Sequence, residues 1–91
     1  MATTDTTRAD ALIAKYIEPH PSKPGISNAR LTTDRHVPVW ALIGHLDVVE
    51  GDIDQVAHDY GVPRDAVDAA IAYYERHKAS IDARLVLNRE G

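Results

Sequence analysis

The chain has 91 residues and a mass of 10.0 kDa, enough for one domain with a single small core and too little for the cleft of an ordinary enzyme. Hydrophobic residues make up 44% of it and charged residues 26%, a composition that excludes a fibrous repeat or a wholly disordered chain. The net charge is −4, and residues 39–91 hold ten Asp or Glu against five Lys or Arg. Within them, residues 47–68 hold seven acids opposed only by Arg64, so this stretch repels a phosphate backbone.

The beginning of the chain is rich in Thr and Asp and lacks apolar periodicity up to Ala11. We expect a flexible or partly helical segment over residues 1–15, with a short helix from Ala11 to Lys15, followed by one domain that spans residues 16–91. Prolines at positions 19 and 21 exclude a helix there and favour extended backbone over residues 16–18.

A small β-hairpin is predicted next. Two short extended runs, Ala29–Thr33 and His36–Val39, flank the polar pair Asp34-Arg35. Pro38 has no N–H for a ladder hydrogen bond, so its strand lies at an edge or ends there. Since a two-stranded ribbon can enter a groove of DNA, the basic side chains of this hairpin are candidate DNA-binding residues. They are Arg30, Arg35 and His36.

From position 39 on, apolar residues recur at i, i+3, i+4 and i+7, the spacing of one buried helical face. Three such sets follow one another: Val39-Leu42-Ile43-Leu46, Ile53-Val56-Ala57-Tyr60 and Val67-Ala70-Ile71-Tyr74. Residues 78–89 continue as helix, with or without a break near Lys78–Ser80. The predicted fold class is therefore mostly α: a helix-turn-helix-like bundle of three to four helices with a short N-terminal β-hairpin.

Residues 53–71 have the spacing of a helix-turn-helix. Asp52 is a suitable N-cap, Gln55 completes a capping box, and Gly61 stands where a left-handed residue ends the first helix. The residues expected to face outward from the second helix are Arg64, Asp65, Asp68 and Ala69. Only Arg64 suits guanine or phosphate, so it is a further candidate DNA contact, whereas the aspartates favour a packing scaffold over DNA reading.

No cofactor, metal or catalytic residue is expected. Cysteine is absent, which excludes a disulfide and a thiolate zinc site. The five histidines show no ligand motif, although folding can bring His45 and His58 together. Ser27 and Ser80 show no activating base.

The sequence also bears on where the protein acts. The apolar run of residues 37–44 is too short to cross a bilayer, and the N-terminus is polar. We therefore expect a cytoplasmic protein without membrane contact.

Trp40, Tyr73 and Tyr74 are expected as core or dimer contacts.

Several short motifs resemble the domain-of-unknown-function family 433, over about residues 16–90. They are His20-Pro21, Ala29-Arg30-Leu31, Val37-Pro38-Val39-Trp40, Gly51-Asp52-Ile53 and Ala70-Ile71-Ala72-Tyr73-Tyr74. Family members carry Gly-Thr-Arg before an Ile-Pro-Val-Trp-like run, and here Asp34-Arg35-His36 stands in its place. The resemblance implies a helix-turn-helix-type domain preceded by short strands, and a place in a VapB-like antitoxin group.

The function implied by this resemblance is binding and neutralising a PIN-like ribonuclease toxin. Acidic residues 47–68 can mimic nucleic acid at the basic rim of a nuclease, or a C-terminal arm can supply apolar anchors and an arginine for the nuclease carboxylates. The partner-binding candidates on that arm are Leu85, Val86, Leu87 and Arg89. Two alternatives stay open: a DNA-binding transcriptional regulator that acts on its own operator, and a homodimeric adaptor. Because two strands are marginal alone, we expect a homodimer.

Overall fold

The computed structural model describes the backbone of residues 2–90 and the side chains of residues 7–88. The described backbone is mostly helical, as predicted, but has five α-helices rather than three to four. They are α1 (Ala2–Tyr16), α2 (Val39–Val48), α3 (Ile53–Tyr60), α4 (Arg64–Arg76) and α5 (Lys78–Glu90), together with strands β1 (Ile17–Glu18) and β2 (Arg30–Leu31) and the 3₁₀ turn η1 (Ile26–Asn28). No helix within residues 2–90 is long and apolar enough to cross a membrane.

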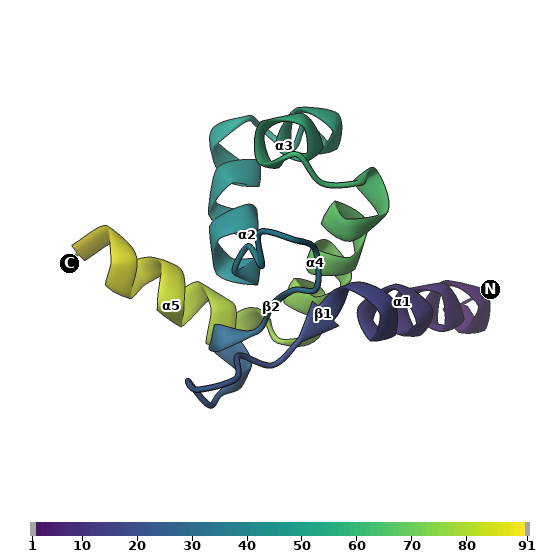
Figure 1. The fold of residues 1–91 in the computed structure, drawn as a ribbon, viewed down its shortest axis with the longest axis horizontal. Helices are drawn as coiled ribbons and strands as arrows, with labels where there is room; N and C mark the ends of the chain where they lie inside the picture. The colour runs from purple at the N-terminus through teal and green to yellow at the C-terminus, as the bar shows by residue number, and fades with distance from the viewer. Residues whose placement is uncertain (1, 91) are drawn as a thin grey trace.

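Helix α4 lies at the centre of the molecule, and the other four helices pack against it (Figure 1). Three of its alanines, Ala66, Ala69 and Ala70, are completely buried, and their small side chains let several helices approach closely. The largest fully buried side chains around them are Leu31, Val39, Leu42, Val56, Val67 and Ile81. This aliphatic core agrees with the predicted apolar faces of α2, α3 and α4.

The caps of α3 lie where the sequence places them. Asp52 accepts a hydrogen bond from the backbone N–H of Gln55 at 3.1 Å, and Gly61 ends the helix in the left-handed conformation with φ 65°. The capping box is only half made, because the side chain of Gln55 donates to Asp59 at 2.7 Å. Pro63 is the N-cap of α4 and the last of the three residues between α3 and α4, where its missing N–H costs little.

Helix α1 is longer than the predicted Ala11–Lys15, because α4 supports it. Arg8 lies 3.5 Å from Asp68, and Asp10 lies 2.6 Å from Arg76. Ala69 shares this face of α4 with both ion pairs, so its predicted outward position is wrong: the α1 side of α4 is covered. Periodicity predicts neither of the two ion pairs, since each joins residues far apart in the chain.

The two-stranded sheet pairs β1 with β2 antiparallel, Ile17 opposite Leu31 and Glu18 opposite Arg30. The predicted hairpin between residues 29–33 and 36–39 shrinks to one bridge, Arg30 with Pro38. Pro38 is also the N-cap of α2, so the second strand has no room to extend before the helix begins. Strand β2 therefore lies between β1 and residues 37–39.

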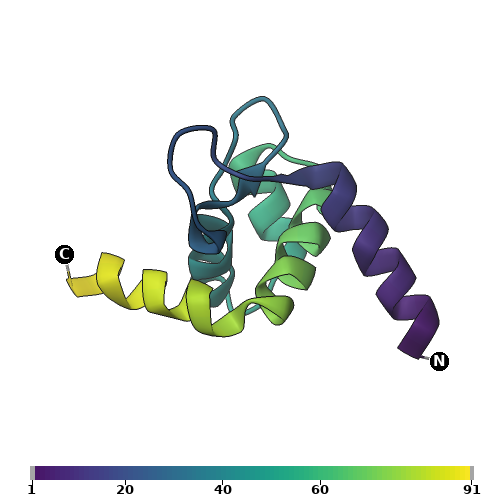
Figure 2. The same cartoon turned by 90° about the horizontal axis from the view of Figure 1, so that it is seen from below.

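The chain breaks between α4 and α5 at His77 (φ −131°), one residue before the segment named from the sequence. The first half of α5 returns to the core through Ile81, which is fully buried. Its second half projects from the body on the side opposite to α1, so that the two ends of the chain lie far apart (Figure 2). The last turns of α5 thus form an arm that the core does not cover.

Replacing Gly61 with Val tests the α3–α4 turn. A Cβ at Gly61 meets no atom within 4 Å, so the cost comes from the left-handed backbone alone. We expect Gly61→Val to lower the free energy of unfolding by about 1–3 kcal/mol, measured by urea denaturation. Gly61→Asn is the matched control, because Asn tolerates this conformation. Equal stability of the Val and Asn variants contradicts the turn geometry.

Candidate functional site

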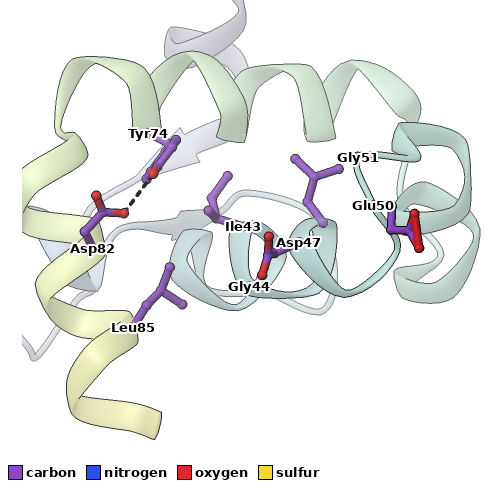
Figure 3. A pocket seen from close by; sticks show the side chains of 9 residues that line it. Ile43, Gly44, Asp47, Glu50, Gly51, Tyr74, Asp82 and Leu85 are labelled. Atoms are coloured by element: carbon purple, nitrogen blue, oxygen red, sulfur yellow. Dashed lines mark hydrogen bonds between the residues drawn. The ribbon is translucent and has the colours of Figure 1, made fainter.

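A groove runs between α2 and α5 and has a volume of about 400 Å³. It is lined by Ile43, Gly44, Leu46, Asp47, Glu50, Gly51, Tyr74, Asp82 and Leu85 (Figure 3). Its apolar side chains come from both helices, while three carboxylates lie along it. This combination fits a partner segment that carries apolar and basic side chains together.

Gly44 lets α5 approach α2 at the groove. A Cβ built at Gly44 would lie 3.2 Å from the Cδ2 atom of Leu85, so a side chain there would require the end of the Leu85 side chain to shift by a few tenths of an ångström. Leu85 points toward α2 from the α5 side (Figure 3) and is half-buried. The missing side chain of Gly44 thus leaves room for the Leu85 side chain at the groove.

Asp82 is held at the groove by two donors. The hydroxyl of Tyr74 donates to its Oδ1 at 2.7 Å, and Lys78 Nζ donates to its Oδ2 at 2.7 Å (Figure 3 shows the Tyr74 bond). The hydrogen bond to Asp82, with a smaller contribution from Tyr74, raises the pKa of Lys78 above its ordinary value of 10.5. Asp82 is therefore an ordered carboxylate, in contrast to exposed Asp47 and Glu50.

The predicted partner-binding residues lie on the α5 arm next to this groove. Leu85 lines the groove, whereas Val86 is 47% exposed and Leu87 66% exposed. The side chain of Arg89 lies outside the described residues. Three apolar side chains thus follow one another from the groove onto the arm, and two of them are available to a partner.

The acidic stretch of residues 47–68 is exposed at six of its seven carboxylates, with Asp68 half-buried. Asp59 lies 2.7 Å from the Nε2 atom of His45, and this bond, together with that from Gln55, holds the pKa of Asp59 below its ordinary value. Other carboxylates pair with Arg64 and Arg8. Asp47 and Glu50 form no ion pair with the residues whose side chains are described, so they keep their charge for a partner.

The four predicted DNA-binding residues differ in their surroundings. Arg30 and His36 line a cleft near the strands, whereas Arg35 lies on a separate depression beside Gly61. Arg64 donates to Asp54 at 2.8 Å at the start of α4. DNA binding through these residues stays a prediction from the sequence.

The histidines form no metal centre within the described part of the chain, where no three His, Asp or Glu side chains gather closely enough to hold an ion. His45 pairs with Asp59 and stacks edge-on against Tyr60, with ring centroids 5.4 Å apart. Trp40, Tyr73 and Tyr74 are half-buried and pack against the core, as predicted.

Sequence reasoning missed Gly44, Tyr74 and Asp82 as lining residues of one groove. Gly44 and Asp82 are ordinary surface residues in the helical pattern, and Tyr74 was assigned to a buried face. The spacing between Tyr74 and Asp82 is eight residues, close to two helical turns, but the break at His77 interrupts the helix that would relate them.

A comparison with known protein families, curated proteins and solved structures gives no match for this chain. The resemblance to the domain-of-unknown-function family 433 therefore stays a prediction from its short motifs.

The Lys78–Asp82 pair predicts a measurable titration. In Asp82→Asn the neutral amide no longer stabilises the ammonium, so the pKa of Lys78 falls toward 10.5. Because folding raises this pKa, the pair's stabilisation is present below pH 10.5 and is lost as pH rises through the folded value. NMR titration of the Lys78 side chain measures it. Tyr74→Phe is the control and should keep most of the elevation, and an unchanged pKa in Asp82→Asn contradicts the pairing.

Proposed function

We propose that this chain is a small non-catalytic protein that binds and neutralises a basic nucleic-acid-processing enzyme, in the manner of a VapB-like antitoxin and its PIN-like ribonuclease toxin. The observation that carries the proposal is an apolar groove with carboxylates along it, beside an α5 arm on which Val86 and Leu87 are exposed. The family resemblance supports the choice of partner class.

The α5 arm supplies the apolar part of this interface. Val86 and Leu87 are exposed in the uncovered half of the helix, whereas Leu85 of the same helix lines the groove. Covering a side chain of this size completely is worth about 1.5–3 kcal/mol. Two such anchors at the centre of a contact are enough to dominate its affinity.

The carboxylates supply charge complementarity. Asp47, Glu50 and Asp82 lie along the groove, and the remaining acids of residues 47–68 extend the negative surface over α3 and the start of α4. An enzyme that binds nucleic acid has a basic rim around its cleft, and this negative surface attracts such a rim. The result would be a partner whose substrate path is covered.

The α3–turn–α4 unit serves in this proposal as a packing scaffold of helix-turn-helix type. Ala69 is buried on the side of α4 that α1 covers, and Arg64 is engaged by Asp54. Both observations weigh against α4 as a helix that reads DNA. The homodimer and the DNA-binding regulator stay predictions from the sequence, and the proposal needs neither.

Replacing the two exposed apolar residues of the arm with aspartate tests the proposal. The tagged chain is used to capture proteins from a nuclease-treated lysate of cells that express it, and any partner recovered in near-equal amount is purified. We expect a basic ribonuclease whose activity falls to near zero on titration with the wild-type chain. Val86→Asp with Leu87→Asp should weaken this inhibition at least about tenfold, because one lost anchor costs more than about 1.4 kcal/mol.

The matched control is Val48→Asp. Val48 is 74% exposed, more than either arm residue, and does not line the groove. Inhibition by this variant should be at least as strong as that of the wild type, because the added carboxylate extends the negative surface and removes no anchor. Asp47→Asn with Glu50→Gln should weaken inhibition mainly at low salt, as surface charges do. Full inhibition by a chain truncated after Arg84 contradicts the role of the arm.

A further inference from the structure

A second hollow lies on the other side of α5, and the proposed function makes no use of it. Its volume is about 190 Å³, roughly the space of six water molecules at about 30 Å³ each. The lining side chains are mostly basic and come from the loop after β1, from η1, from the strands, from the start of α2 and from α5. They are His20, Lys23, Asn28, Arg30, His36, Pro38, Trp40 and Arg84. We call this hollow the basic cleft.

Arg84 is a cation held without a carboxylate. Its Nη1 donates to the side-chain oxygen of Asn28 at 2.6 Å, and its guanidinium carbon lies 5.5 Å from the ring centroid of Trp40. Among the residues whose side chains are described, no acid pairs with it. A half-buried guanidinium fixed by a neutral amide and an aromatic ring keeps its charge and most of its donors for an anion.

Arg30 faces the same cleft with its charge only partly used. Its Nε donates to Glu18 at 2.7 Å, and in the described structure this is its single side-chain bond. Glu18 is also 3.4 Å from His36 and is the one acid in contact with the lining groups. With Lys23, Arg30 and Arg84 against Glu18, the cleft carries two net positive charges even with both imidazoles neutral.

His20 adds a directed donor. Its Nδ1 accepts hydrogen bonds from the backbone N–H groups of Ser22 and Lys23, at 3.1 and 3.0 Å. An imidazole whose Nδ1 accepts carries its proton on Nε2, so the other edge of the ring donates. The same turn leaves the ammonium of Lys23 exposed and without a bond to any described residue.

We propose that the basic cleft binds a phosphate group, as inorganic phosphate or as the terminal phosphate of a nucleotide. Arg30 and Arg84 offer planar, multidentate donors from two elements, β2 and α5, and the exposed Lys23 adds a point charge. The cleft is separate from the groove: α5 gives Asp82 and Leu85 to the groove and Arg84 to the cleft. The two proposals therefore stand or fall independently.

Calorimetric titration of the purified chain tests the site with three probes: inorganic phosphate, AMP and adenosine, each against sodium chloride of equal ionic strength. Phosphate and AMP should bind at one site per chain, and adenosine should not. Tighter binding of AMP than of phosphate identifies a nucleotide as the source, and equal affinity identifies free phosphate. Failure of both anions to bind, or equal binding of adenosine, overturns the proposal.

Two substitutions and one control locate the binding. Arg84→Gln and Lys23→Gln should each weaken phosphate binding at least about fivefold, the loss expected for one charge-assisted hydrogen bond. Lys23→Gln removes no contact within the described structure, so it tests the site even if Arg84→Gln perturbs α5. Arg35→Gln removes the same charge as Arg84→Gln at a position outside the cleft. Equal weakening by all three variants shows diffuse attraction instead of a site and overturns the proposal.

Discussion

Every other helix packs against α4, and the alanines of α4 make this possible. Ala66, Ala69 and Ala70 have no exposed surface, and with side chains of one carbon they let α1, α2, α3 and α5 all come close to the same axis. Larger residues would force these helices apart and strain a core whose fully buried side chains are all aliphatic. The positions of α2 and α5, and so of the groove between them, follow from this central packing.

Helix α5 separates two surfaces of opposite charge. Asp82 and Leu85 face the groove, which is apolar and acidic, and Arg84 faces the basic cleft on its other side. Consecutive residues on a helix point about 100° apart, so side chains within a single turn of α5 line both the groove and the basic cleft. A partner protein on one side and a phosphate group on the other are therefore compatible with one folded chain.

Local rules were sufficient for the helices of the core. The apolar spacing of 3.6 residues predicts α2, α3 and α4, and Asp52 and Gly61 mark the two ends of α3. The exposure of Val86 and Leu87 also follows from local pattern, because Ile81 and Leu85 already occupy the buried face of α5. In each case the physical cause acts within a few residues of the chain, so the sequence carries it directly.

Contacts between distant residues were beyond those rules. The length of α1 depends on Arg8 and Asp10 meeting α4, and the basic cleft depends on Arg84 reaching Asn28, 56 residues earlier. The hairpin was reduced to one bridge because α2 begins directly after Pro38. Periodicity predicts whether a side chain lies on the buried or the exposed face of its own helix. Which element packs against the buried face depends on how well whole surfaces fit together. The groove and the basic cleft both result from this packing between elements.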